Sequence, residues 1–207
     1  MPIITSIKPQ KNRKRVNIHL DDKFGFGLDL ENFMKLGLRV EQELSDKEIK
    51  IILKKAEFQK ALDKLLRYAT LRPRSEKEFR NWLRKHKVHE SLYKELFNRL
   101  KRLELINDKV FAKWWIGQRK EFRPTSKRIM NYELRSKGIG RYIIEDVLAD
   151  IDIDEVKIAK GLLNKRMYRW EMLPKRKARQ KMSEFLGRYG FGWDIIKKII
   201  DDVLEKD

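Results

Sequence analysis

The stretch TLRPRSEKEFRNWLRKHKV, residues 70–88, carries the signals of a helix start, and these signals return later in the chain. Pro73 has no backbone N–H and therefore resists continuation of a preceding helix. Ser75 suits the N-cap position, and Glu78, three residues later, completes a capping box. FRPTSKRIMNYELRSKGI, at residues 122–139, is nearly the same: Pro124 and Ser126 precede another amphipathic run. This echo predicts a structural repeat in which a helix begins at the serine.

Beyond residue 57 the repeat occurs three times. The second helix of each copy has a matched apolar pair: Phe79 and Leu83, Met130 and Leu134, and Met182 and Leu186. A turn (HKV, KGI or YGF) and a third amphipathic helix follow each pair. Units this small bury their apolar faces only by stacking on neighbours. The predicted fold class is mainly all-α, an elongated curved array of three tandem three-helix repeats with a small N-terminal β-hairpin or sheet.

The turns after the second helices support this alignment. Gly138 and Gly190 suit a left-handed residue that closes a helix, whereas Lys87 in the first copy lacks that tolerance and predicts a different exit. Three apolar residues then precede the third helices and predict a hydrophobic staple in each copy: Val88, Ile139 and Phe191. The third copy begins at Pro174 without a serine or threonine cap.

The N-terminal region differs from the repeats. ITSI, VNIHL and FGFGL are short β-like runs separated by turn residues, and Leu30 to Leu36 predicts a short helix ending at Gly37. Ser45 and Glu48 form a further capping box. The predicted domains are residues 1–57 for this region and 58–104, 105–152 and 153–207 for the repeats.

Composition points to an anionic partner. The 207 residues include 50 Lys and Arg against 31 Asp and Glu, a formal net charge of +19. This excess favours nucleic acid, or a protein already bound to nucleic acid. A generally charged surface, as in thermophile proteins, would explain the amount of charge but not its sign. Cysteine is absent, and no apolar run approaches the roughly 20 residues that span a bilayer, so we expect a cytoplasmic protein.

Basic residues gather near the start of the second helix in each copy, so that stacking would line them along one edge. Tyr168 and Trp170 lie among the cations of the third copy, where they could stack on bases or belong to the core. The candidate contact residues are Arg72, Arg74, Arg119, Lys120, Arg123, Lys127, Arg128, Lys165, Arg166, Arg169, Lys175, Arg176, Lys177 and Arg179.

Catalytic patterns are weak. The histidines His19, His86 and His89 have no carboxylate cluster that would complete a metal site. The sequence also lacks a phosphate-binding loop of the Gly-x-x-x-x-Gly-Lys type. We therefore predict a protein that is not an enzyme and uses no metal or cofactor.

Several segments together resemble the RecX family of recombinase regulators. They are RPRSE from Arg72, LIND from Leu105 followed by Phe111-Ala112, KGI from Lys137 and RYGF from Arg188. The resemblance covers roughly residues 58–205 and implies an all-helical array of three-helix repeats. It further implies binding to RecA filaments on single-stranded DNA, in their helical groove, with inhibition of recombinase and coprotease activity. Separately from the resemblance, we expect a monomer. The alternative is a stand-alone basic protein that binds single- or double-stranded DNA as an architectural or transcriptional factor, without RecA.

Overall fold

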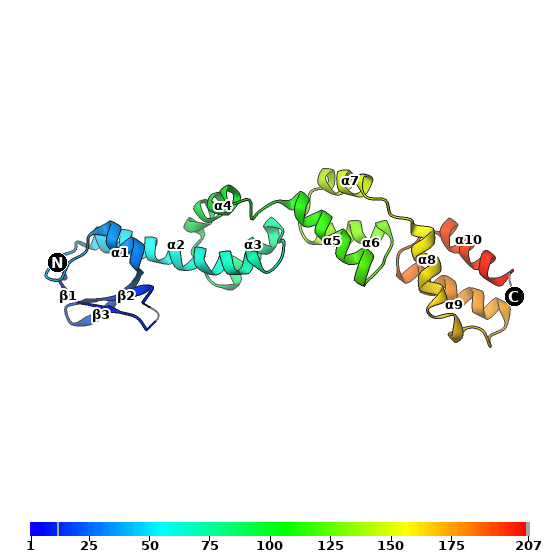
Figure 1. Cartoon of the computed structure of the whole chain (residues 1–207), viewed down its shortest axis with the longest axis horizontal. Helices are drawn as coiled ribbons and strands as arrows, with labels where there is room; N and C mark the ends of the chain where they lie inside the picture. The colour runs from blue at the N-terminus through cyan, green and yellow to red at the C-terminus, as the bar shows by residue number, and fades with distance from the viewer. Residues whose placement is uncertain (12, 206–207) are drawn as a thin grey trace. The chain divides into compact units, whose positions relative to one another are not determined.

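The computed structural model describes residues 1–11 and 13–205, which form two compact units. The first unit comprises residues 1–72 and 81–103, and the second comprises residues 73–80 and 104–207. Figure 1 shows a small N-terminal sheet followed by helices to the C-terminus. The predicted class, mainly helical repeats after a β region, is confirmed.

The N-terminal sheet is antiparallel with strand order β1-β2-β3. Its strands are β1 (Ile4–Pro9), β2 (Arg15–Leu20) and β3 (Lys23–Asp29). Asp21 and Asp22 form the β2–β3 turn with φ of +47° and +61°, the paired left-handed conformation of a tight hairpin. One face of the sheet is buried against residues from the segments that follow it, among them Leu44 and Ile52.

Two helices connect the sheet to the first repeat. Helix α1 (Leu30–Leu36) ends at Gly37, which has φ +60°, and α2 (Asp46–Thr70) begins with the predicted Ser45–Glu48 capping box. Both helices contact β3. Residue 57, where the sequence placed a domain boundary, lies inside α2, so one continuous helix serves the sheet and the first repeat.

The repeats follow in the predicted order. The first has α2, α3 (Glu76–Lys85), η1 (Glu90–Leu92) and α4 (Tyr93–Arg102). The second has α5 (Asp108–Phe122), α6 (Lys127–Ser136) and α7 (Arg141–Asp150). The third has α8 (Glu155–Asn164), η2 (Met167–Arg169), α9 (Lys175–Arg188) and α10 (Trp193–Leu204). All three predicted apolar pairs are buried: Phe79 and Leu83, Met130 and Leu134, and Met182 and Leu186.

The turn after the second helix is the same in all three repeats, which corrects one prediction. Lys87 adopts φ +53°, a left-handed conformation like that of Gly138 (+84°) and Gly190 (+81°). In each copy the next N–H, that of Val88, Ile139 or Phe191, donates to the carbonyl five residues earlier, at 3.1, 3.0 and 3.4 Å. The prediction of a different exit at Lys87 was therefore wrong.

Packing explains why glycine is needed in only two of these turns. A Cβ at Gly138 would lie 2.7 Å from the Cβ of Lys77, and one at Gly190 would lie 2.5 Å from Cγ1 of Ile129. Lys87, by contrast, is exposed, so only the backbone conformation opposes a side chain there.

Candidate polyanion interface

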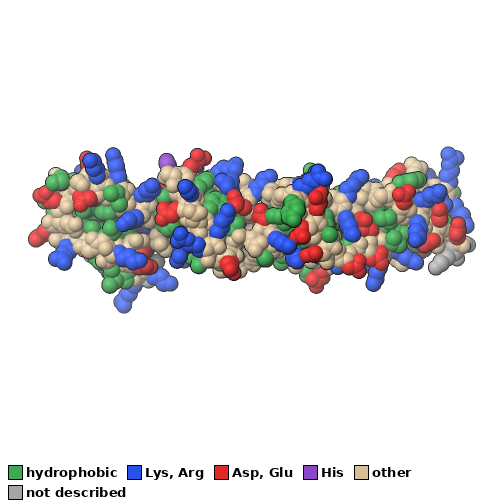
Figure 2. Space-filling model, turned by 90° about the horizontal axis from the view of Figure 1, so that it is seen from above, with side chains coloured by type: hydrophobic (Ala, Val, Ile, Leu, Met, Phe, Trp, Pro, Cys, Tyr) green, Lys and Arg blue, Asp and Glu red, His purple; other side chains and the backbone are tan. Residues whose placement is uncertain are grey.

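Charge on the surface is mixed as well as abundant. Figure 2 shows Lys and Arg side chains interspersed with Asp and Glu over the face that it presents. A contact with a polyanion on this face must therefore depend on local groups of cations rather than on one broad basic surface.

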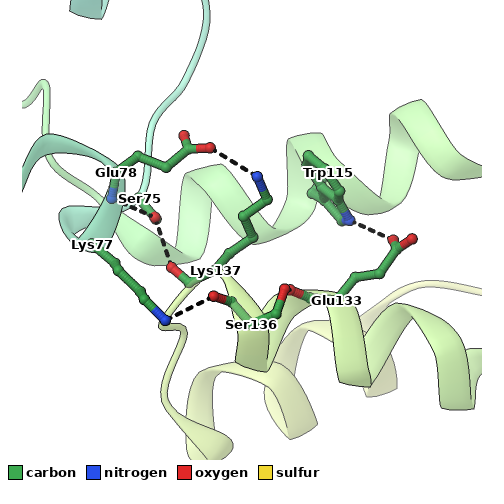
Figure 3. Close-up of polar contacts among 7 residues, drawn as sticks. All are labelled: Ser75, Lys77, Glu78, Trp115, Glu133, Ser136 and Lys137. Atoms are coloured by element: carbon green, nitrogen blue, oxygen red, sulfur yellow. Dashed lines mark hydrogen bonds and ion pairs between the residues drawn. The ribbon is translucent and has the colours of Figure 1, made fainter. Parts of the chain in front are cut away.

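The serine of the opening motif is structural. Ser75 is buried, its Oγ accepts from the N–H of Glu78 at 3.2 Å, and it donates to the carbonyl of Lys137 at 2.8 Å (Figure 3). Lys77 Nζ donates to the carbonyl of Ser136 at 2.9 Å, and Lys137 Nζ pairs with Glu78 at 3.1 Å. The start of α3 is thus fastened to the last turn of α6.

The next junction is built in a similar way. The N–H of Ser126 donates to the carbonyl of Tyr189 at 3.2 Å, which fastens the start of α6 to the end of α9. The first N–H of α6 donates to Glu155 at 2.9 Å, just as the first N–H of α3 donates to Asp108 at 2.9 Å. Since protein groups already bind these amides, the two helix starts do not offer them to a phosphate.

One predicted contact residue belongs to the interior of the second repeat. Arg119 Nε pairs with Glu133 at 2.6 Å, and its guanidinium lies 4.7 Å from the centre of the Trp115 ring. Trp115 Nε1 donates to the same carboxylate at 2.9 Å (Figure 3). Arg119 is largely buried by these contacts, so we leave it out of the interface proposed below.

The remaining cations of the first two repeats lie at or near the surface. Arg72 and Arg74 are half-buried on either side of Pro73. Arg123 is exposed, and Lys120 is exposed with its Nζ donating to the carbonyl of Asp152 at 2.8 Å.

Helix α6 carries a basic hollow of about 370 Å³. Lys127 and Arg128 were predicted contact residues, and the structure places Arg135 and Tyr132 beside them, with Asn131 completing the helix side of the lining. Leu148 of α7 forms the opposite wall, and no carboxylate lines the hollow among the described residues. The side chain of Tyr132 is 71% exposed. Sequence analysis missed Tyr132 and Arg135, although their spacing of four and seven residues from Arg128 places them on the same helix face.

In the third repeat the structure separates the aromatic residues. Trp170 is buried against Phe185, with ring centres 5.5 Å apart, and so belongs to the core. Tyr168 is exposed, and the Arg169 guanidinium lies 5.6 Å from its ring centre. Arg166 lies 5.1 Å from the centre of the Phe185 ring. Only Tyr168 of the two predicted aromatics is therefore available for stacking.

The other cations of this repeat are exposed, and two of them have protein partners. Arg179 pairs with Asp201 at 2.6 Å, and Lys175 Nζ donates to the carbonyl of Leu204 at 3.4 Å. Lys165, Arg176 and Lys177 project from exposed positions.

No group of three or more His, Cys, Asp or Glu side chains in residues 1–11 and 13–205 is arranged to hold a metal ion. Over the same residues, no helix has the length and apolar character needed to cross a bilayer.

Tandem three-helix units that follow a small antiparallel sheet define a class of helical-repeat proteins. Family models narrow this class: the regulatory protein RecX N-terminal domain matches residues 2–45, and the second and third three-helix domains of RecX match residues 107–148 and 153–200.

Similar proteins agree with this assignment. The chain is 32% identical to a regulatory protein RecX of Clostridioides difficile, over 100% of this chain and 98% of that one. It is 31% identical to the regulatory protein RecX of Bacillus licheniformis, over 98% of this chain and 78% of that one. A crystal structure of regulatory protein RecX superposes with a TM-score of 0.74 at 27% identity, covering 97% of this chain and 100% of the other. The chain belongs to the RecX family of regulatory proteins.

Proposed function

We propose that the chain binds filaments of the RecA recombinase on single-stranded DNA, in their helical groove, and inhibits their ATPase, recombinase and coprotease activities. Membership of the RecX family supports RecA as the partner. The net charge of +19 favours a partner that carries nucleic acid.

The observation that carries the proposal is the hollow on α6. Lys127, Arg128 and Arg135 line it together with the exposed Tyr132, and no carboxylate joins them there among the described residues. Three cations in a hollow whose described lining includes no carboxylate favour phosphate, and an exposed ring beside them offers a stacking surface to an unpaired base. A nucleoprotein groove presents both kinds of group.

Inhibition requires a preference between filament states. A ligand shifts an equilibrium only by its differential affinity for the two states. The chain must therefore bind most tightly to a filament geometry that is unfit for strand exchange or extension, or it must occupy the path of the incoming DNA. Bridging of adjacent RecA protomers by successive repeats would supply such a preference.

The test is RecA ATPase activity on single-stranded DNA, measured against the molar ratio of this protein to RecA. We expect inhibition well below one molecule per RecA protomer, because one bound molecule blocks extension for many subunits. The rival function, stand-alone DNA binding, predicts tight binding to bare DNA and inhibition only when the protein saturates the DNA. An ATPase rate unchanged at sub-stoichiometric ratios would favour the rival.

A further inference from the structure

A second hollow, of about 700 Å³, lies in the first unit between β3 and α2. The β3 residues in the lining are Phe24, Gly25, Phe26 and Gly27. The α2 residues in the lining are Leu53, Ala56, Glu57, Lys60, Asp63, Lys64 and Arg67. Every residue of its lining belongs to the first unit, so this site is separate from the basic hollow on α6.

Cations follow the α2 side of this hollow in a row. Lys60, Lys64 and Arg67 are spaced by four and three residues, which places them on one face of the helix over roughly 10 Å of its length. All three are exposed, and within the described part of the chain none of them forms an ion pair. Arg15 of β2 adds a fourth cation, held by its hydrogen bond to the carbonyl of Gly27 at 2.9 Å.

The two carboxylates in the lining have protein partners. Glu57 accepts from the N–H of His89 at 3.2 Å, and Asp63 accepts from Gln59 at 2.8 Å. The remaining balance of charge in the hollow is positive, because four cations face two acids that already accept hydrogen bonds. An anionic ligand complements this balance.

An exposed aromatic ring stands beside the cations. Phe24 is 64% exposed, whereas Phe26, two residues later, is buried in the core of the unit. The difference arises from a β-bulge: Ile18 pairs with Phe26 and His19 with Phe24, so Gly25 is the extra residue. A Cβ at Gly25 would lie 2.9 Å from Leu20 Cγ, so the bulge requires glycine.

We propose that this hollow binds a short stretch of single-stranded nucleic acid, with Lys60, Lys64 and Arg67 at its phosphates and Phe24 against one base. Stacking on Phe24 requires an unpaired base, so a duplex does not use this contact. The inference does not depend on the proposed action on RecA, because its test contains no recombinase.

The first test measures binding of the full-length chain to a labelled twelve-residue oligothymidylate as a function of salt. The variant Lys60→Ala/Lys64→Ala/Arg67→Ala should make the log–log salt slope shallower by about 2, since each lost phosphate contact contributes roughly 0.7. The matched control is Lys47→Ala/Lys50→Ala/Lys54→Ala, which removes three exposed cations from the same helix outside the hollow. Equal changes of slope in the two triple variants would overturn the proposal.

The second test isolates the aromatic ring. Phe24→Ala should weaken oligothymidylate binding by about 5- to 150-fold, the range for loss of one base–aromatic stack, and leave binding to a duplex of the same length unchanged. Phe122→Ala, at another exposed phenylalanine, is the control. The proposal fails if Phe24→Ala and Phe122→Ala behave alike, or if duplex binding falls as much as single-strand binding.

Folding is checked for every variant by circular dichroism and thermal melting. If Phe24→Ala does not fold, the triple variant on α2 decides alone, because alanine is favourable at exposed helix positions. Oligothymidylate binding that is unchanged in a folded α2 triple variant would reject nucleic acid as the occupant.

Discussion

Ser75 joins two helices through one hydroxyl. It caps α3 by accepting from Glu78 N–H, and it donates to the carbonyl of Lys137 at the end of α6. Since the side chain is buried, water does not replace either bond when the hydroxyl is removed. The serine is therefore a stability residue, although arginines with a proposed binding role flank it in the sequence.

Ser75→Ala should lower the free energy of unfolding by about 1–2 kcal/mol, the usual cost of a lost cap, while RecA inhibition by the folded protein stays unchanged. Urea denaturation measures the first effect and the ATPase titration the second. Ser183→Ala is the control, because Ser183 bonds only back to the Arg179 carbonyl within α9 and alanine is well tolerated there. A stability change no larger than that of the control would show that the Ser75 bonds contribute little.

Lys87, unlike Ser75, is less suited to its position than a substitute would be, because glycine adopts the same backbone conformation with less strain. Its φ of +53° costs a non-glycine residue about 1–2 kcal/mol, whereas glycine loses about 0.5–1 kcal/mol more backbone entropy on folding. Lys87→Gly should therefore raise the free energy of unfolding, by up to about 1 kcal/mol. Lys85→Gly, at the last residue of α3, should lower the free energy of unfolding. Urea denaturation measures both variants. A change of the same sign in both would contradict this account.

At the scale of the element, the turns decide how helices from successive repeats meet. Gly190 needs glycine for two reasons, its φ of +81° and the approach of Ile129 and Ser126 from α6. Gly37 shares only the first reason, because a Cβ there would meet nothing within 4 Å. Alanine variants of Gly190 and Gly37 therefore separate the cost of backbone strain from the cost of packing.

Gly190→Ala should lower the free energy of unfolding by about 2–4 kcal/mol, since overpacking adds about 1–3 kcal/mol to left-handed strain of about 1 kcal/mol. Gly37→Ala should cost only about 1 kcal/mol. The measurement is denaturant unfolding of both variants, analysed with one common m-value. Equal losses would mean that the end of α9 moves away from α6 without penalty.

The start of α2 is sensitive to acid. Ser45 donates through both its backbone N–H and its hydroxyl to Glu48, and these bonds hold the pKa of the Glu48 carboxyl below its usual value, the hydroxyl bond contributing most. Because the folded pKa is depressed, the stabilisation is present at neutral pH and is lost as pH falls through that folded pKa. An NMR titration of Glu48 should therefore show a low pKa in the wild type and a higher one in Ser45→Ala. An unchanged pKa would contradict the capping box.

Elements with strong local signals were predictable from the sequence, and contacts between distant segments were not. The Ser45–Glu48 capping box, Gly138, Gly190 and the apolar pairs follow from spacing within about ten residues. Of the predicted Ser75–Glu78 box the structure gives the serine cap, whereas the Glu78 carboxylate pairs with Lys137. The conformation of Lys87 was mispredicted because only the preference of glycine for a left-handed backbone was considered. The hydrogen bonds that close the turn, from Lys87 N–H to Arg84 and from Val88 N–H to Leu83, offset the left-handed strain of the lysine. Arg119 has no local signal for its partner, since Glu133 lies on the next helix.

For the whole molecule, the excess of positive charge predicts a polyanionic partner but not where it binds. Sequence analysis named fourteen cations from their density, and the structure engages some of them, such as Arg119 and Arg179, in ion pairs. Helical spacing places Tyr132 and Arg135 on the face of Arg128, but their shared hollow with Leu148 follows only from the fold. A candidate interface therefore needs both the excess of charge and the folded positions of the acids that neutralise part of it.

The last prediction tests whether the arginines near the starts of α3 and α6, here called the basic loops, act on the RecA filament. Reversal of four charges, Arg72→Glu, Arg74→Glu, Arg123→Glu and Arg128→Glu, should raise the concentration for half-inhibition of RecA ATPase at least tenfold. The log–log salt slope of single-strand binding should become shallower by up to about 3, if each arginine neutralises one phosphate. The melting temperature should fall by only a few degrees, because Arg123 and Arg128 are exposed and Arg72 and Arg74 are no more than half-buried.

A matched variant makes this result specific. Lys50→Glu, Lys94→Glu, Lys197→Glu and Lys198→Glu change the net charge by the same amount at exposed helix positions outside the loops. If attraction between net charges alone drives binding, both quadruple variants should lose inhibition equally, since long-range steering depends on total charge. If the loops make the contact, the loop variant loses far more inhibition than the control variant. The reason is that it removes short-range pairs with phosphates, which salt screens less effectively. Equal losses, or a large drop in melting temperature of the loop variant alone, would assign these arginines to the fold rather than to the filament.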